Sequence, residues 1–195
     1  RPIQTGEVWG SAWQSAWFHI TGRVPAAWRG ADVALRFDAN GESLVFDDAG
    51  CPVYGLTNGS VFASAFSKDI YRIFEPCRGG EAVDLWIEAA AYGLFGINRH
   101  GDPRRDAPER HGHYTGRVVQ MELVRFETAA WHYWLDLVVL LDLVEALEPH
   151  TPRRNQLIEA MTRSVARFEV QGLAGVAAAR AELEAASRLP PSIFV

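Results

Sequence analysis

The sequence lacks an excess of positive charge, since 19 basic residues against 24 acidic residues give a formal net charge of −5. Nucleic-acid binding depends on basic side chains that neutralise phosphates, so this balance argues against a nucleic-acid partner. Cysteine is scarce as well, with only Cys51 and Cys77. A disulfide framework needs more cysteines than this. We expect two small buried thiols in a reducing compartment, with a single Cys51–Cys77 bridge as the open alternative.

The chain also lacks the patterns of a secretory leader and of a transmembrane helix. Its first ten residues, RPIQTGEVWG, contain no charged stretch followed by an apolar run. The most apolar run, LDLVVLLDLVEAL (residues 135–147), is too short to span a bilayer and carries three acidic residues. These absences predict a cytoplasmic protein without a membrane partner. A start without methionine predicts an excised or processed piece of a longer chain.

Motifs of common catalytic centres are missing too, because no nucleophile elbow, glycine-rich phosphate loop or P-loop occurs. His100, His111 and His113 lie in one charged segment, but a zinc site needs three or four convergent ligands. Their glycine and charged neighbours favour a solvated loop. His132 stands among apolar residues and is predicted to pack inside the protein. From the residues alone we expect no catalytic, cofactor or metal site in this chain.

What the first half does contain is the alternation of apolar and polar residues that strands show. The side chains predicted to face a core are Phe18, Ile20, Val24, Val33, Leu35 and Phe37. Those predicted to face outward from the second of these strands are Ala34, Arg36 and Asp38. Asn40-Gly41 is predicted to form a tight hairpin turn, and residues 48–50 a second turn. Many short strands separated by turns predict an antiparallel β-sandwich over residues 1–97.

Residues 98–116, NRHGDPRRDAPERHGHYTG, interrupt this alternation with charges and prolines, which predicts an exposed loop or linker. Residues 117–147 then contain neither glycine nor proline and place apolar residues on nearly every turn. This pattern predicts one long helix that is apolar over a broad face and therefore well buried.

Two further helices are predicted after it. Thr151 is a suitable N-cap with Pro152 in the first turn, and Gly172 separates a third, alanine-rich helix over about residues 173–188. The apolar stripe predicted on the second helix is Leu157, Met161, Val165 and Phe168. Together the helices form a predicted connector over residues 117–188. Strands followed by helices favour a segregated α+β fold over alternating βαβ units.

Tryptophan is frequent near the start, where WGSAWQSAWF places Trp9, Trp13 and Trp17 four residues apart. The small and polar residues between them argue against a helix. Further on, VDLWIEAA alternates, so that its polar residues and one tryptophan share a face. Packing is the plainer interpretation of this face, and a sugar-facing surface is the functional alternative. The candidate carbohydrate-facing residues are Trp13, Trp28, Trp86 and Glu88.

Four short motifs follow one another along the chain. In order they are Trp9-Gly10 with Trp17-Phe18, Pro25 and Trp28-Arg29-Gly30; Gly41-Glu42 with Leu44-Val45-Phe46; Gly50 with Pro52-Val53 and Gly55-Leu56; and Glu88-Ala89 with Gly93-Leu94-Phe95-Gly96. With these motifs and the long helix after them, the chain resembles the region before the catalytic domain of cytosolic and vacuolar-type α-mannosidases of glycoside hydrolase family 38. In that pattern Trp9-Gly10 forms an opening turn and Trp17-Phe18 begins the first strand, which leaves Trp13 unexplained.

The resemblance implies a jelly-roll or galactose-binding-like sandwich and a parent enzyme that hydrolyses terminal α-mannosidic bonds with retention. In the family, an apolar strand like LPPSIFV leads into a Gly-His-x-His-x-Asp motif, whose His and Asp bind the catalytic zinc. Residues 189–195 are therefore expected to be the first strand of a catalytic domain that this chain lacks. The resemblance gives the chain itself no catalytic residue and no cofactor.

Three functions remain open on the sequence alone. The first is a non-catalytic scaffold that packs against its own catalytic domain and against other subunits of a homo-oligomer. A second is a carbohydrate-binding module that presents mannosides to the catalytic domain. The third is a stand-alone interaction protein, which predicts that the gene ends near residue 195.

Overall fold

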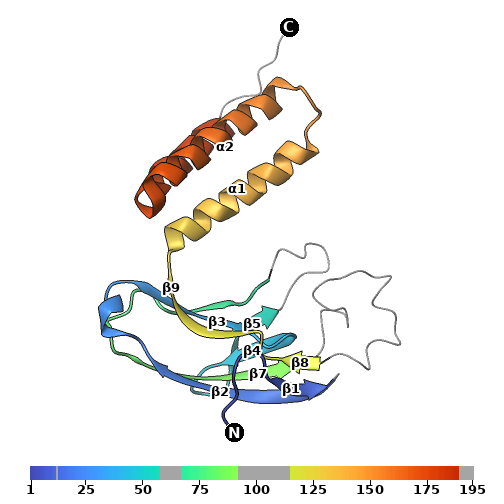
Figure 1. Cartoon of the computed structure of the whole chain (residues 1–195), viewed down its shortest axis with the longest axis vertical. Helices are drawn as coiled ribbons and strands as arrows, with labels where there is room; N and C mark the ends of the chain where they lie inside the picture. The colour runs from blue at the N-terminus through green and yellow to red at the C-terminus, as the bar shows by residue number, and fades with distance from the viewer. Residues whose placement is uncertain (12, 58–66, 92–114, 189–195) are drawn as a thin grey trace. The chain divides into compact units, whose positions relative to one another are not determined.

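The computed structural model describes residues 1–11, 13–57, 67–91 and 115–188, which divide into two compact units. The first unit, residues 1–126, holds strands, and the second, from residue 127 onward, holds helices (Figure 1). The predicted α+β class, a sandwich followed by a helical connector, is confirmed. The boundary predicted at residue 97 and the strand predicted at residues 189–195 lie outside the described residues.

The strands of the first unit form two main sheets. Their bounds are β1 (Val8–Ser11), β2 (Ser15–Arg23), β3 (Asp32–Asp38), β4 (Glu42–Phe46), β5 (Pro52–Thr57), β6 (Ile70–Phe74), β7 (Ala82–Ala90), β8 (Thr115–Arg117) and β9 (Gln120–Phe126). One sheet has the order β2-β7-β4-β5 and the other β6-β3-β9, while β1 and β8 form a small third sheet. All neighbouring strands in them are antiparallel.

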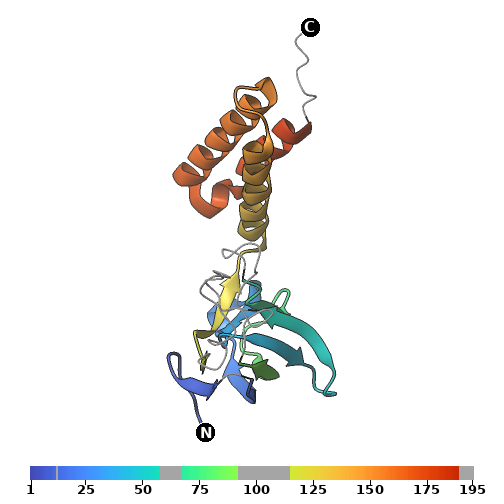
Figure 2. The ribbon, with the colours of Figure 1, turned by 90° about the vertical axis from the view of Figure 1, so that its right-hand side faces the viewer.

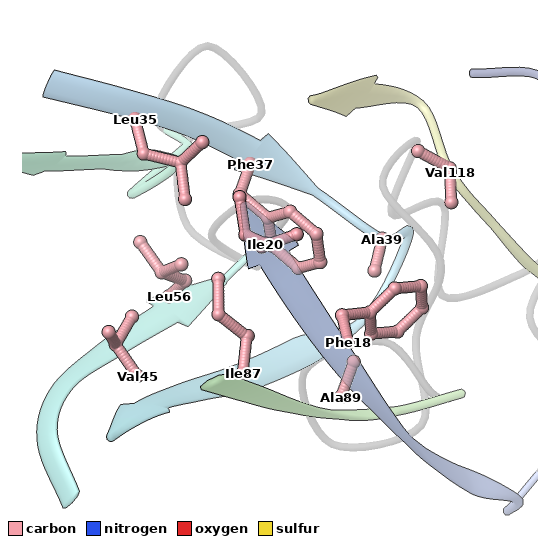
Figure 3. Packing of buried hydrophobic residues seen from close by; sticks show 10 residues of the cluster. All are labelled: Phe18, Ile20, Leu35, Phe37, Ala39, Val45, Leu56, Ile87, Ala89 and Val118. Carbon is pink, nitrogen blue, oxygen red and sulfur yellow. The ribbon is translucent and has the colours of Figure 1, made fainter. Parts of the chain in front are cut away.

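The core of this unit lies between the two main sheets, where inward side chains from both sheets meet (Figure 3). Phe18 comes from β2 and Ile87 from β7, and they meet Phe37 from β3. The six side chains predicted to face a core, Phe18, Ile20, Val24, Val33, Leu35 and Phe37, are all buried. Burial of one face of each strand is what made the alternating pattern visible in the sequence.

The outward face of β3 differs from the prediction, because Ala34 and Asp38 are buried. β3 is the central strand of its sheet, and the Asp38 carboxylate accepts a hydrogen bond from the Asn40 N–H at 2.7 Å. The hairpin predicted at Asn40-Gly41 is also wrong, since this turn carries the chain from β3 in one sheet to β4 in the other. The turn predicted at residues 48–50 is confirmed, and it joins the paired strands β4 and β5.

The long helix predicted over residues 117–147 is wrong in its first eleven residues, because α1 begins only at Thr128. Residues 120–126 form β9, which pairs with β3 along its whole length. Met121 and Leu123 of this strand pack against the sandwich core. Pairing with β3 and burial of these side chains therefore outweigh an apolar spacing that also fits a helix.

Residues 115–117, at the end of the predicted loop, form β8 beside β1. Trp9-Gly10 consequently lies in a strand and not in the opening turn that the resemblance implied. The Trp9 indole lies close to Gly116, where an added Cβ would approach the ring to 2.5 Å, and the indole Nε1–H donates to the Ala39 C=O at 3.0 Å. The rest of the predicted linker, with His100, His111 and His113, lies outside the described residues.

The second unit contains α1 (Thr128–Ala146), α2 (Pro152–Gln171) and α3 (Val176–Arg188), with the short 3-10 helix η4 (Gly172–Gly175) between the last two. The three helices pack around one shared core (Figure 2). The predicted N-cap is confirmed, since the Thr151 hydroxyl accepts a hydrogen bond from the Arg154 N–H at 3.4 Å. Gly172, with φ of 57°, ends α2 as predicted.

Two details of the helices correct the predictions. In the stripe on α2, Leu157 is buried and Met161 and Phe168 pack on the core, but Val165 is 37% exposed. His132 is exposed, and the next residue, Tyr133, takes the buried position instead. In each case the packing of the neighbouring helices selects a narrower face than the apolar residues of the sequence cover.

Both cysteines are free thiols, so they form no bridge. Cys77 is buried as predicted, and its thiol donates to the Trp28 C=O at 2.9 Å. Cys51 is exposed, contrary to the prediction, because it follows the surface turn between β4 and β5.

Candidate functional site

Two of the four candidate carbohydrate-facing residues share one surface. Trp86 and Glu88 lie on the outer face of β7, where Trp86 is 45% exposed. Trp28 belongs to the 3-10 helix η1 (Ala26–Trp28) after β2 and packs against a buried apolar cluster. Trp13 lies before β2, and its side chain is 66% exposed. Its backbone N–H donates to the C=O of Ala91, which follows β7. The structure therefore brings Trp86 and Glu88 together and places the other two elsewhere.

The outer face of the sheet β2-β7-β4-β5 carries an aromatic patch made of Trp17, His19, Phe46 and Trp86. The His19 ring stacks on the Trp86 ring, with centroids 4.3 Å apart and planes within 3° of each other. The Trp17 ring lies 4.7 Å from the Phe46 ring and 6.5 Å from the Trp86 ring. Trp17 is 54% exposed, so the aromatic patch presents indole surface to solvent.

Trp17 and His19 were not among the candidate residues. Their outward direction follows from the alternation around Phe18 and Ile20, which the sequence did predict. What the sequence does not contain is the register between β2 and β7, which sets His19 opposite Trp86. The only local signal was the four-residue spacing of the tryptophans.

Carboxylates border the aromatic patch. The Asp84 Oδ1 lies 2.7 Å from the His19 Nε2, and Glu88 stands opposite both Trp17 on β2 and Leu44 on β4. A hollow of about 400 Å³ adjoins Glu88 and Leu44, and Gly55 leaves it open because it has no side chain. Rings beside carboxylates suit a sugar, whose apolar face packs on an indole while its hydroxyls donate to the carboxylates.

A second hollow, of about 680 Å³, runs between β2 and β9, the edge strands of the two main sheets. Residues 16–21 of β2 form one side, and residues 121–123 of β9 form the other. The core residue Leu35 and the Trp9 indole also line it. Residues 1–3 and Trp86 line it as well. Within the described residues this hollow follows the two strand edges, and we call it the edge cleft.

Helix α1 has a surface of another kind, because large apolar side chains lie on several of its faces, beside the acidic Asp136, Asp142 and Glu145. Only three of its 19 residues are buried, namely Tyr133, Leu140 and Val144. Large apolar side chains on its other faces are exposed by 38–64%: Trp134, Val139, Leu141 and Leu143. An apolar groove of about 420 Å³ between α1 and α2 adds Ile158, Met161 and Val165 to this surface. Apolar side chains on several faces are typical of a helix that is buried on more than one side.

The described residues do not fit the zinc that the family resemblance implies for the parent enzyme. Within these ranges, no three His, Cys, Asp or Glu side chains come together in a way that could hold a metal ion. Among the described helices we also find none with the length and apolar character needed to cross a membrane.

Comparison with known proteins identifies the family. Residues 1–117 match the family described as the jelly roll domain of alpha-mannosidase. The chain is similar to human alpha-mannosidase 2C1, with 30% identity over 85% of its residues, and to the mouse protein of that name, with 28% over 84%. It is also similar to alpha-mannosidase G of Dictyostelium discoideum, with 25% over 81%. The matches span only 14–15% of the length of these relatives. The chain belongs to the family of alpha-mannosidase jelly roll domains.

Proposed function

We propose that the chain is a non-catalytic region of a cytoplasmic α-mannosidase of glycoside hydrolase family 38, and that it packs against the catalytic part of that enzyme and between its subunits. The parent would hydrolyse terminal α-mannosidic bonds with retention. Its zinc and its aspartate nucleophile would come from residues outside this chain. The relatives, which carry the name alpha-mannosidase and are far longer than this chain, support the proposal.

The observation that carries the proposal is the apolar surface of α1. Val139 and Leu143 lie one helical turn apart and are 64% and 41% exposed. Exposed apolar patches of this kind mark surfaces that contact another protein or domain. A scaffold needs such a surface, whereas an independent module would be expected to carry polar residues there.

The test has two parts. The chain with added zinc should give no turnover of an aryl α-mannoside, and turnover above the blank would refute the non-catalytic role. In the parent enzyme, Val139→Gln with Leu143→Gln should loosen the packing and lower the temperature at which activity is lost. Val170→Gln is the control, because Val170 is 85% exposed on α2 and distant from this turn in sequence. Equal effects of the two changes would contradict the role of α1.

A second candidate function is a carbohydrate-binding module, which the aromatic patch favours. Trp17 and Trp86 would be its platforms and Glu88 its hydroxyl acceptor. Calorimetry with α-mannobiose should then give heat that Trp86→Ala abolishes and that Trp134→Ala, on α1, leaves unchanged. No heat with mannose or α-mannobiose would refute this function. A stop codon near residue 195 would instead favour the third hypothesis, a stand-alone interaction protein.

A further inference from the structure

In the part of the chain that the structure describes, β2 is an edge strand whose nine residues pair on one side only. Among the described residues, β7 is its one neighbour in the sheet, and the register between them is continuous from Ser15 to Arg23. No other backbone hydrogen bond within the described ranges reaches these nine residues. In an antiparallel ladder every second residue turns its N–H and C=O to one side, so about half of β2 directs these groups to the free edge.

The other edge strands of the main sheets carry the features by which proteins block edge pairing. β5 begins with Pro52 and has a register irregularity against β4. β6 is only five residues long and holds Arg72 at its centre. β9 holds Glu122 and Arg125. β2 has none of these features, because SAWFHITG contains no proline and no lysine, arginine or acidic residue, and the first such charge is Arg23.

From this contrast we propose that two copies of the chain associate through β2, in antiparallel pairing about a two-fold axis at His19. The two β2-β7-β4-β5 sheets then become one continuous sheet. The inference goes beyond the scaffold role of α1, since it names the contact between subunits and uses a different surface. A two-fold axis is the usual symmetry of a homodimer and requires a self-complementary surface.

The sequence of β2 is self-complementary in this register. Trp17 of one copy stands opposite Thr21 of the other, an aromatic and β-branched pair of the kind that stabilises sheets. The inward-facing Phe18 and Ile20 also come opposite each other, which continues the apolar layer across the axis. Arg23 falls opposite the uncharged Ser15, so no like charges meet at the ends.

The edge cleft supports the same arrangement. Its lining includes the buried core side chains Phe18 and Ile20 together with residues 1–3 of the N-terminal segment. β2 and β9 line the same cleft, so an axis that joins β2 to its copy also brings the two β9 edges toward each other. Trp17, His19 and Trp86 of the aromatic patch also line this cleft, so the patch lies beside the axis in both copies.

Sedimentation tests the association first. The chain should sediment as a dimer of twice its 21.6 kDa mass, and the dimer should dissociate on dilution. His19→Lys sets two like charges opposite each other at the axis and should weaken the dimer several-fold. Val139→Gln, on α1, should leave it intact. Far-UV circular dichroism of each variant checks that it is folded.

Cysteine cross-linking then tests the register, in a Cys51→Ser background that removes the exposed thiol. His19→Cys should form a disulfide-linked dimer on mild oxidation. Thr21→Cys alone should not, because its two copies would lie about 13 Å apart along the strands, beyond the reach of a disulfide. A mixture of Trp17→Cys and Thr21→Cys chains should cross-link to each other.

Three results would overturn the inference. One is a chain that stays monomeric at high concentration. Another is a dimer that Val139→Gln dissociates and His19→Lys does not, which would assign the contact to α1 and leave the scaffold proposal standing. The third is equal cross-linking of His19→Cys and Thr21→Cys chains, which no two-fold pairing centred on His19 allows.

Discussion

Ser164 joins all three helices of the second unit through one buried hydroxyl. It lies on α2, and its Oγ is 2.7 Å from the Ala179 C=O on α3 and 3.0 Å from the Tyr133 hydroxyl on α1. A carbonyl oxygen can only accept, so Ser164 donates its one proton to Ala179 and accepts the proton of Tyr133. Ser164 is fully buried and Tyr133 is 4% exposed, so water does not replace these bonds.

Ser164→Ala removes both hydrogen bonds and should lower the free energy of unfolding of the helical unit by about 2 kcal/mol, at about 1 kcal/mol for each bond. Tyr133→Phe removes only one bond and should cost about 1 kcal/mol. Independent effects would sum to about 3 kcal/mol in the double variant. Because both changes delete the same Tyr133–Ser164 bond, the double variant should instead lose about 2 kcal/mol, a coupling of about 1 kcal/mol.

Urea unfolding followed by far-UV circular dichroism measures these free energies, since the helices dominate that signal. Ser187→Ala is the matched control, because Ser187 is an exposed serine on α3 that donates to the Glu184 C=O within its own helix. It should change the free energy by less than about 0.5 kcal/mol. An additive double variant, at about 3 kcal/mol, would refute the shared network. So would a Ser164→Ala variant as stable as the control.

Further predictions concern other parts of the chain. Gly116→Ala should destabilise the sandwich by about 1–3 kcal/mol in urea, because the new Cβ meets the Trp9 ring at 2.5 Å. The hydrogen bond and charge of Arg167 lower the pKa of Glu182. The stabilisation from this pair is present above the ordinary carboxyl pKa and is lost as the pH falls through the lowered value, so Glu182→Gln should flatten the acid limb of stability against pH. A thiol reagent should modify Cys51 rapidly in the native chain, and the buried second thiol only in urea.

The sequence predicted the strands that have one buried face and failed where pairing partners decide the structure. Phe18 and Ile20 alternate with polar residues, so the burial of β2 could be predicted without a partner. Residues 120–126 have apolar positions that suit a strand and a helix equally, and only the register with β3 settles the choice. The Asn40-Gly41 turn shows the same limit, because a tight-turn sequence does not say in which sheet the next strand pairs.

The candidate site was predicted in part for a related reason. Alternation within β7 placed Trp86 and Glu88 on an outer face, and a single strand is enough for that inference. The stacking partner of Trp86 is His19, which lies 67 residues earlier and meets it only through the β2–β7 register. Trp13 and Trp28 were chosen from tryptophan density alone, and density does not distinguish a turn from a sheet face.

The sequence predicted that the long helix is well buried, but only three residues of α1 are buried. The apolar pattern of the helix is that of a buried element, yet within the described residues only one side of it is covered. Val139 therefore contributes little to the stability of the helical unit alone, and Val139→Gln should change its unfolding free energy by less than about 0.5 kcal/mol. The scaffold role predicts a contact that buries this side chain in the parent enzyme, where the same change would then cost about 1.5–3 kcal/mol. Urea unfolding of the chain and of the parent measures the cost of Val139→Gln in each. The cost in the parent minus the cost in the chain gives the strength of the contact. Equal costs in both would mean that the exposed face of α1 stays in solvent, and the apolar pattern would then need another explanation.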